Sequence, residues 1–384
     1  MKSKLQEMYK AHRSQVSTGR EARLATAREM IEFLEDGTIN AEDVSLREVF
    51  DLLVVQGVRE DKGIDFNPQF SEISSIQEDI VSSMFPTITG KLFHQTLIKA
   101  YEPASNAVQK LFMQTTSAHR EETVVGLTAG ARARHVEEGM PFPEAQIGEK
   151  RCLIRNHKFG QKTSLTAEAV LFDQTGEVLN AARTRGSYLA DLLEEFACYR
   201  LQDVAWGPID ESTSQAFVYG GTRYAIWADT HTTVDGQVND NNVGTGARPN
   251  IEQVENGLNL LAQMKDEKGN PIRIRPKVVY GHEILAPSIN RFFNYQDYDI
   301  DSAERNANPY KNSVQVFTSP FFSNSTKWHY GDPASQFRMQ WVRKPTTDTA
   351  PGDPTRDVLM SFLSSMFVGI GATDYRFVIE NAGA

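Results

Sequence analysis

The stretch that decides the fold is Gln174–Asp203, which reads QTGEVLNAARTRGSYLADLLEEFACYRLQD. Its apolar and small residues recur at steps of three and four positions, the period of an α-helix. Asp173 or Thr175 can cap the beginning of this helix, and Trp206-Gly207-Pro208 ends it. At 1.5 Å per residue such a helix is about 40 Å long. Its repeating face consists of Leu179, Ala182, Gly186, Leu189, Leu193, Phe196 and Arg200.

Two further amphipathic helices are predicted near the beginning of the chain. Residues 2–36 are rich in helix-forming residues and end at Asp36-Gly37, a typical stop signal. A second helix is expected over 46–57, with Ser45 as its N-cap. Amphipathic helices usually cover the core of their own domain, so this interpretation is favoured over an arm that docks on a neighbouring subunit. The apolar positions are Leu24, Ala27, Ile31 and Leu34 in the first helix, and Leu46, Val49, Phe50 and Leu53 in the second.

Strand and helix patterns alternate in the second half of the chain. A helix over 250–265 capped by Asn250, a turn over 266–271, a strand over 272–280 and a helix over 283–293 follow one another. Pro345–Pro354 is predicted to be a flexible loop. This alternation indicates a mixed α/β domain. Further expected elements are a helix over 90–101, strands at Val314–Thr318, Trp328–Tyr330 and Phe337–Val342, and two strands within 358–379.

A long polar insert interrupts the region from residue 121 to 165. Strand patterns at Glu122–Leu127 and Arg151–Phe159 flank the segment GLTAGARARHVEEGMPFPEAQIGEK. Loops of this length inside a compact domain are uncommon unless they are functional. A hairpin of two strands is marginally stable alone in water, so we expect its faces to contact another chain. Basic and acidic residues are mixed here, which suits contact between copies of one surface.

The composition excludes several classes of protein. The chain has 384 residues, and its 40 Lys+Arg against 50 Asp+Glu give a net charge of -10. A protein with this charge is not expected to bind the phosphate backbone of a nucleic acid over a broad surface. Cys152 and Cys198 cannot form a disulfide framework, which suits assembly in a reducing cytoplasm. The charged first residues do not resemble a signal peptide, and the apolar run at 358–370 is too short to span a membrane.

Motifs of catalysis and metal binding are missing from the sequence. The eight histidines include no HExxH pattern, and no Walker loop, GxSxG or GxGxxG occurs. The acidic run at 297–301 and the set Asp235, Gln237 and Asn239 are spaced like the first ligands of a calcium loop, but neither continues with the ligands that such a loop needs. Weak cation binding stays open as an alternative. We therefore predict no catalytic, cofactor-binding or metal-binding residue. A second alternative stays open, a cytoplasmic α/β metalloenzyme that uses His231, Asp229 and His282.

The order of these elements resembles the major capsid proteins of tailed bacteriophages, which have the Hong Kong 97 fold. The resemblance covers roughly residues 65–384, is strongest to Mu-like major head subunits, and implies an α+β fold. It rests on FPTI (85–88) with Leu92–Tyr101, EEGMP (137–141) with Gly148-Glu149, the helix 174–203, AIWADTHTT (225–233), the helix 250–264, KDEKGNPIRIRPKVVYGHEILAPSINRFF (265–293), VQVFTSPFF (314–322) and VGIGATDYRFVIENAGA (368–384).

The resemblance implies a division of the chain into parts. Some members of the family link a lysine of the E-loop covalently to an asparagine of a neighbour. Lys150, Lys158 and Lys162 have suitable positions, but the surrounding pattern does not match, so none is a predicted site. The implied parts are an N-terminal helical extension (1–60), an N-arm (61–120), an E-loop (121–165), a P-domain with the spine helix (166–215), an A-domain (216–335), and the return strands of the P-domain with the C-terminus (336–384).

The function implied by the resemblance is structural. A chain of this kind assembles with itself into pentamers and hexamers, which form an icosahedral shell around packaged double-stranded DNA. The implied partners are further copies, a portal, DNA held by weak non-specific contact, and in some members a scaffold, protease or cement protein. The implied location is the virion capsid, assembled in the bacterial host cytoplasm, without a membrane partner. The alternatives are an encapsulin-like nanocompartment shell, a tail-connector or adaptor protein, and the metalloenzyme named above.

Overall fold

The chain forms two compact units. The first contains Met1–Ala104, Lys158–Asp191 and Arg343–Phe367, and the second contains Ser105–His157, Leu192–Val342 and Val368–Ala384. The computed structural model describes residues 2–16, 18–39, 44, 46–56, 59, 84–127, 135, 149–166, 169, 177–219, 222–233, 236, 238–244, 246–294, 308–352 and 358–383.

The N-terminal sequence forms two helices where the periodicity predicted one. Helix α1 spans Lys2–Gln15 and helix α2 spans Gly19–Glu35. The chain breaks at Thr18, whose hydroxyl accepts a hydrogen bond from the Glu21 amide and caps α2. The predicted stop is confirmed, because Asp36 is the C-cap and Gly37 follows with a φ of 71°, which glycine adopts without strain.

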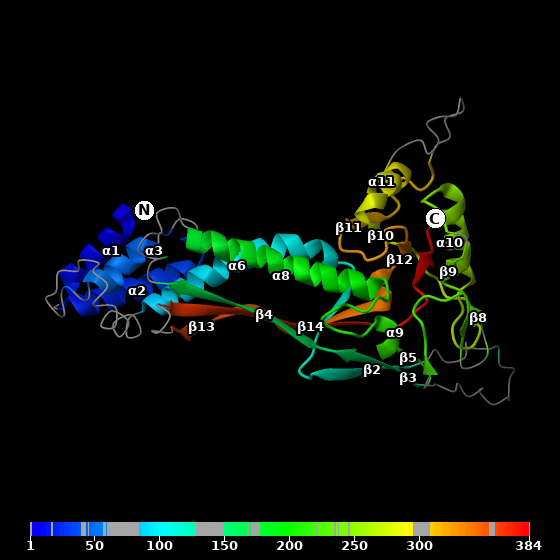
Figure 1. Ribbon diagram of the computed structural model, residues 1–384, viewed down its shortest axis with the longest axis horizontal. Coiled ribbons are helices and arrows are strands. Elements are labelled where there is room, and N and C mark those ends of the chain that lie inside the picture. The colour runs from blue at the N-terminus through cyan, green and yellow to red at the C-terminus, as the bar shows by residue number, and fades with distance from the viewer. Residues whose placement is uncertain are drawn as a thin grey trace, which may run out of the picture. The chain divides into compact units, whose positions relative to one another are not determined.

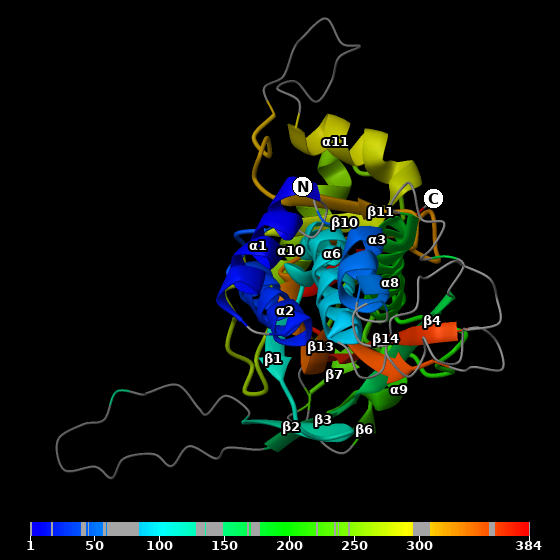
Figure 2. The ribbon, with the colours of Figure 1, turned by 90° about the vertical axis from the view of Figure 1, so that its left-hand side faces the viewer.

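The second predicted helix is confirmed over most of its length. Helix α3 spans Leu46–Phe50 and continues as a π-helical turn over Asp51–Val55. Its predicted apolar face is buried, and the Phe50 ring meets the Phe85 ring edge to face at 5.4 Å. The Gln95 amide donates to the Leu34 carbonyl at 2.6 Å, and Lys91 pairs with Glu35. The N-terminal helices therefore pack within the first unit, in agreement with the favoured interpretation (Figure 2).

Two long helices lie side by side in the first unit (Figure 1). Helix α6 spans Phe85–Gln109, well beyond the predicted 90–101, and helix α8 spans Glu177–Leu201. The prediction of α8 is confirmed, and the start of the predicted range lies outside the described residues. The helices approach most closely at Gly186, where an added Cβ would lie 2.3 Å from the Leu97 carbonyl oxygen and 2.9 Å from the Ala100 Cβ. Only glycine permits this approach.

A four-stranded sheet has the strand order β1-β13-β14-β4. Strand β1 (Met113–Thr116) runs parallel to β13 (Phe337–Pro351), followed by β14 (Val358–Ala372) and β4 (His157–Thr166). Helix α6 packs on β14, where the Phe93 and Phe362 rings stack at 4.3 Å.

One loop prediction is wrong. Residues 345–351 belong to strand β13, although their Pro and Asp content resembles a loop. The threonines between the prolines are β-branched and favour a strand. Thr347 lies 3.5 Å from Ser364 of β14, hydroxyl to hydroxyl, and Thr349 packs against Gly90 of α6. Tertiary contacts therefore order the first part of the predicted loop.

The second unit contains a five-stranded mixed sheet of order β11-β10-β12-β15-β9. These strands span Gln315–Ser319, Val278–His282, Trp328–Gly331, Val378–Asn381 and Asn242–Val243 respectively. The predicted strand over 272–280 is wrong in its first part, since the strand begins at Val278. Pro276 cannot donate a backbone hydrogen bond to a neighbouring strand, which explains the later start.

Two helices cover the apolar face of this sheet. Helix α10 spans Ile251–Gln263, with the Asn250 side chain accepting from the Gln253 amide at 2.8 Å as predicted for its cap. Helix α11 spans Ala286–Asn294 after a 3-10 turn at Glu283–Leu285, which confirms the helix predicted there. The core between helices and sheet consists of Val243, Val254, Leu261, Val279, Leu285, Ile289, Phe292, Phe293, Trp328, Tyr330 and Ile379.

Short elements complete the described chain, and the α+β class is confirmed. In the part of the molecule that the structure describes, every helix is too short or too polar to cross a membrane. The short elements are β2 (Glu121–Leu127), β3 (Glu149–Arg155), α9 (Thr213–Ala216), β5 (Val218–Tyr219), β6 (Thr222–Arg223), β7 (His231–Thr232), β8 (Val238–Asn239) and α12 (Pro333–Gln336).

The contact at Gly186 makes a prediction about stability. Alanine is about 1 kcal/mol better than glycine in a helix interior, whereas overpacking a core costs about 1–3 kcal/mol. Because the added methyl group would meet the backbone of α6, we expect Gly186→Ala to lower the free energy of unfolding and the Tm. Thr184→Ala, on the exposed side of the same helix, is the matched control and should leave the Tm unchanged or slightly raised. A Gly186→Ala protein as stable as the wild type would contradict the close approach.

Candidate assembly site

The predicted hairpin is present in the second unit. Strands β2 and β3 are antiparallel, with Glu121 opposite Arg155 and Leu127 opposite Glu149. The prediction of two strands is confirmed, except that Arg151–Phe159 is not one strand, because Asn156 separates β3 from β4. The polar insert between the strands lies outside the described residues apart from His135.

One face of the hairpin packs on the second unit. Cys152 and Ile154 are buried, and an added Cβ at Gly371 of β14 would lie 2.8 Å from Ile154 Cγ1. At the base, the Asn156 side-chain amide donates to the His119 carbonyl at 2.7 Å, and the Asn156 backbone amide donates to the Arg120 carbonyl at 2.8 Å. The hairpin is therefore held by its base and by its inner face.

Ion pairs strengthen the same base. The Arg155 guanidinium donates to Glu211 at 2.7 Å and to Glu121 at 3.1 Å. The charge of Glu211 and its hydrogen bond raise the pKa of Arg155, and Glu121 adds to this effect. Both pairs are partly exposed, so each contributes little to stability. One arginine thus bridges Glu121 of the hairpin and Glu211 at its base.

The other face of the hairpin is available for contact. Residues opposite each other in an antiparallel pair share a face, so Thr123 lies beside Leu153, and Val125 beside Arg151. The Val125 side chain is 55% exposed. We call this set the outer face of the hairpin. It consists of Glu121, Thr123, Val125, Arg151, Leu153 and Arg155.

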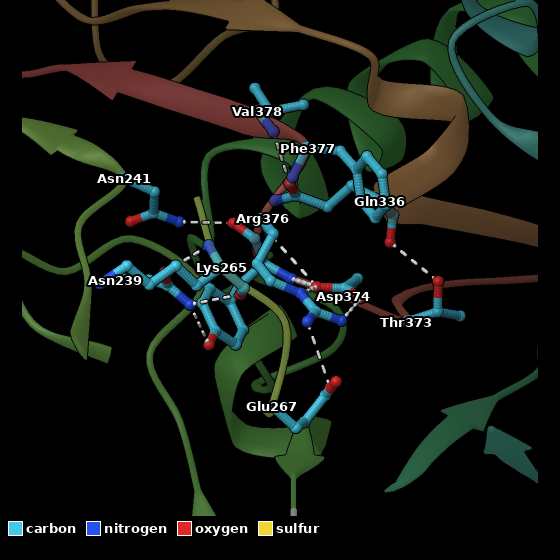
Figure 3. A network of polar contacts seen from close by, with 11 residues as sticks. Asn239, Asn241, Lys265, Glu267, Gln336, Thr373, Asp374, Arg376, Phe377 and Val378 are labelled. Atoms are coloured by element: carbon cyan, nitrogen blue, oxygen red, sulfur yellow. Dashed lines mark hydrogen bonds and ion pairs between the residues drawn. The ribbon is translucent and has the colours of Figure 1, made fainter. Parts of the chain in front are cut away.

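A buried polar network anchors the segment that leads into β15 (Figure 3). The Arg376 guanidinium donates to both carboxylate oxygens of Asp374, at 2.8 and 2.6 Å, and lies 3.2 Å from Glu267. All three side chains are at most 6% exposed. Burial acts to lower the pKa of Arg376, but the hydrogen bonds and charge of Asp374, together with Glu267, raise it overall. The arginine is therefore charged, and two carboxylates surround it.

Amide side chains complete this network. Gln336 accepts hydrogen bonds from the backbone amides of Phe377 and Val378, at 3.2 and 2.8 Å. Asn241 donates to the Tyr375 carbonyl at 2.8 Å, and the Asn239 amide exchanges hydrogen bonds with the backbone of Lys265. These contacts satisfy buried backbone groups next to β15 (Figure 3). Sequence reasoning missed Asp374, Arg376 and Gln336, because Glu267 and Gln336 lie far along the chain from the segment 374–378 that they contact.

The residues of the metalloenzyme alternative have other roles. The His231 ring stacks on Tyr375 at 4.1 Å, its Nε2 lies 3.2 Å from Asn241 Oδ1, and burial lowers its pKa. His282 Nδ1 accepts from the Ile284 amide and caps a 3-10 turn. Among the described residues, no group of three or more His, Cys, Asp or Glu side chains is arranged to hold a metal ion.

Several other candidate residues can be placed only in part. The acidic run at 297–301 lies outside the described residues, as do Asp235 and Gln237, whereas Asn239 belongs to the polar network. Cys152 and Cys198 are both free thiols and buried. Lys158 lies over the Phe367 ring at 5.4 Å, and Lys162 is exposed on β4.

Comparison with known proteins identifies the family. The profile described as "Phage capsid protein" matches residues 154–381, more than half of the chain. The chain therefore belongs to this phage capsid protein family, which confirms the resemblance to phage capsid proteins. A search of curated proteins gives no match. The narrower likeness to Mu-like head subunits stays a prediction.

Solved structures similar to this chain are remote in sequence. The virus-like particle from Pyrococcus furiosus is 10% identical, with a TM-score of 0.45, and the match covers 76% of this chain and 98% of that chain. The capsid of the native GTA particle is 12% identical, with a TM-score of 0.47 and coverages of 72% and 89%. Gordonia phage Cozz is 15% identical, with a TM-score of 0.45 and coverages of 71% and 84%.

The buried network makes a second prediction. Arg376→Ala leaves the carboxylates of Asp374 and Glu267 buried without their cation, which typically costs about 3–5 kcal/mol. Arg343→Ala removes an ion pair whose partners are 38% and 59% exposed, and such pairs contribute about 0–1 kcal/mol. Chemical denaturation should therefore show a much larger loss in the free energy of unfolding for Arg376→Ala than for Arg343→Ala. Equal losses of stability would contradict the anchoring role of Arg376.

Proposed function

We propose that this chain is the major shell subunit of a tailed phage or prophage, and that it acts as a structural protein rather than an enzyme. Copies associate into pentamers and hexamers, and these close into an icosahedral shell around double-stranded DNA. Membership of the phage capsid protein family supports the class of protein. The capsid and virus-like particle named among the similar structures agree with self-association.

The observation that carries this proposal is the hairpin with one face packed and one face open. A two-stranded sheet needs a third strand or a packing surface to be stable. The inner face finds that surface in the second unit, whereas the outer face presents Val125 and half-buried Leu153 to the outside. Burial of this face against another copy would remove apolar area from water. We infer that the hairpin, the E-loop of the resemblance, contacts a neighbouring subunit.

Charge limits how such a shell can hold DNA. Each copy carries a net charge of -10, so the phosphate backbone is repelled on average and only local basic groups can approach it. We therefore propose weak, non-specific contact between shell and DNA. A portal, and in some systems a scaffold, protease or cement protein, would be the further partners, and assembly would take place in the host cytoplasm. An encapsulin-like compartment is the less favoured alternative, because the matching family is one of phage capsid proteins.

Electron microscopy of the purified protein tests the proposal directly. A chain of 43.0 kDa that forms a shell should elute as capsomers or as particles of megadalton mass, with closed icosahedral shells in the micrographs. Size-exclusion chromatography with light scattering gives the mass independently. A monomer at all salt and protein concentrations would overturn the shell function. Open rings that never close would indicate a connector instead.

The outer face of the hairpin can be tested by a single substitution. Val125→Asp places a charge on an already exposed position, so the subunit should fold with an unchanged Tm, whereas particle yield should fall at least tenfold. Val238→Asp is the matched control, since Val238 is 54% exposed on β8. Particles of Val125→Asp at the wild-type yield would show that this face meets no other subunit.

A further inference from the structure

A row of polar side chains crosses the face of the five-stranded sheet opposite to α10 and α11. The strand register places Tyr280 of β10 beside His329 of β12, His329 beside Glu380 of β15, and Glu380 beside Asn242 of β9. Cross-strand neighbours point to the same side of a sheet. The next row along, with Val279, Tyr330 and Ile379, points into the apolar core. The two faces of β15 therefore differ sharply in polarity.

Three members of the row, Tyr280, His329 and Glu380, are buried and touch. Tyr280 and His329 are 0% exposed and Glu380 is 2% exposed. His329 Nε2 lies 3.3 Å from Glu380 Oε2, and the other carboxylate oxygen accepts from Lys327 Nζ at 2.8 Å. The His329 ring stacks on Tyr280 at 4.7 Å, and the Trp227 ring lies 4.8 Å away. Strand β15 is thus joined to β12 by a histidine–carboxylate contact as well as by the backbone.

Charge in this row is already balanced. Lys327 neutralises the Glu380 carboxylate, so a positive charge on His329 would be an additional buried charge. The titratable groups around His329 are Glu380, Lys327 and Tyr280, with Cys198 of α8 next to Tyr280. Burial lowers the pKa of His329 against the opposing attraction of Glu380. Burial would raise the pKa of Glu380, but His329 and Lys327 lower it overall.

We propose that His329 is a proton-sensitive clamp on strand β15. When the His329 imidazole is neutral, β15 is paired in the sheet. When the ring is protonated, the state in which β15 is detached from the sheet is favoured, because water can then hydrate the charge. The sign follows from linkage: the ring binds a proton near pH 6.5 when exposed, but only at lower pH when buried. Stability that depends on the neutral ring is complete above pH 6.5 and falls as the pH drops toward the pKa of the buried ring.

Hydrogen exchange of the purified full-length protein tests this clamp. The measured quantity is the protection factor of amides 378–381 between pH 7.5 and 5.0. One proton linked to opening changes the opening equilibrium up to tenfold per pH unit, so protection should be flat above pH 6.5 and fall by up to about 30-fold at pH 5.0. His329→Gln, which stays neutral, should abolish this slope. His12→Gln, a histidine of α1 that pairs with Glu29 at 2.7 Å, should keep it.

Three results would overturn the clamp, and two of them need no variant. Protection that rises on acidification would mean that His329 is charged in the closed sheet, as an ion-pair partner of Glu380. Protection that does not change with pH would mean that the ring is not linked to opening. An unchanged slope in His329→Gln would assign the effect to another group. If this variant does not fold, the wild-type protein alone decides, by whether the protection factors of amides 378–381 fall or rise on acidification.

Discussion

The insertion of β15 between β12 and β9 is the constraint on which the second unit depends. Residues 378–381 hydrogen-bond on one side to 328–331 and on the other to 242–243, so three distant segments make one sheet. Without β15 the two remaining pieces would share no ladder. The chain fixes the position of this strand twice. Ile379 fits against Gly257 of α10 on one face, and Glu380 meets His329 and Lys327 on the other. A slip of one residue would exchange these side chains and bury a carboxylate in the apolar core.

Polar side chains supply the specificity of this arrangement, whereas apolar packing supplies most of its driving force. Arg376, Asp374 and Glu267 form a buried charged cluster that is stable only when all members are present. Gln336 holds the amides of two residues at the start of β15. Such a network tolerates one geometry, so it selects a single position for the last strand. The hairpin follows a similar principle, with Asn156 and Arg155 fixing its base.

The local elements of the fold could be predicted from the sequence, and the long-range ones could not. Helices α8 and α10 were predictable because their apolar residues recur at helical spacing and Asn250 is a strong cap. The break at Thr18 lies inside a continuous apolar pattern, so periodicity alone cannot show it. Pro345–Pro351 resembles a loop by composition, yet contacts with α6 and β14 make it a strand. Strand order and register depend on residues far apart, which one sequence without relatives does not reveal.

The candidate site divides in the same way. The hairpin was predictable as two strands around a long insert, and the marginal stability of isolated hairpins is the reason for proposing that it contacts another chain. Which face is open could not be predicted, because neither strand alternates cleanly. The roles of Gln336 and His329, and the contact of Arg376 with Glu267, arise from partners more distant still. The family resemblance predicted the class of protein, and the matching family profile confirms that class. It did not predict the roles of individual residues.

The place of β15 in the chain also has a consequence for biosynthesis. The first unit requires residues 343–367 and the second requires 378–381, so each core can close only after the ribosome has translated its own late stretch. Until then the nascent polypeptide holds helices but not a finished sheet. Contacts that need a finished sheet can therefore form only after these late stretches have been synthesised, so shell growth follows the completion of the sheets.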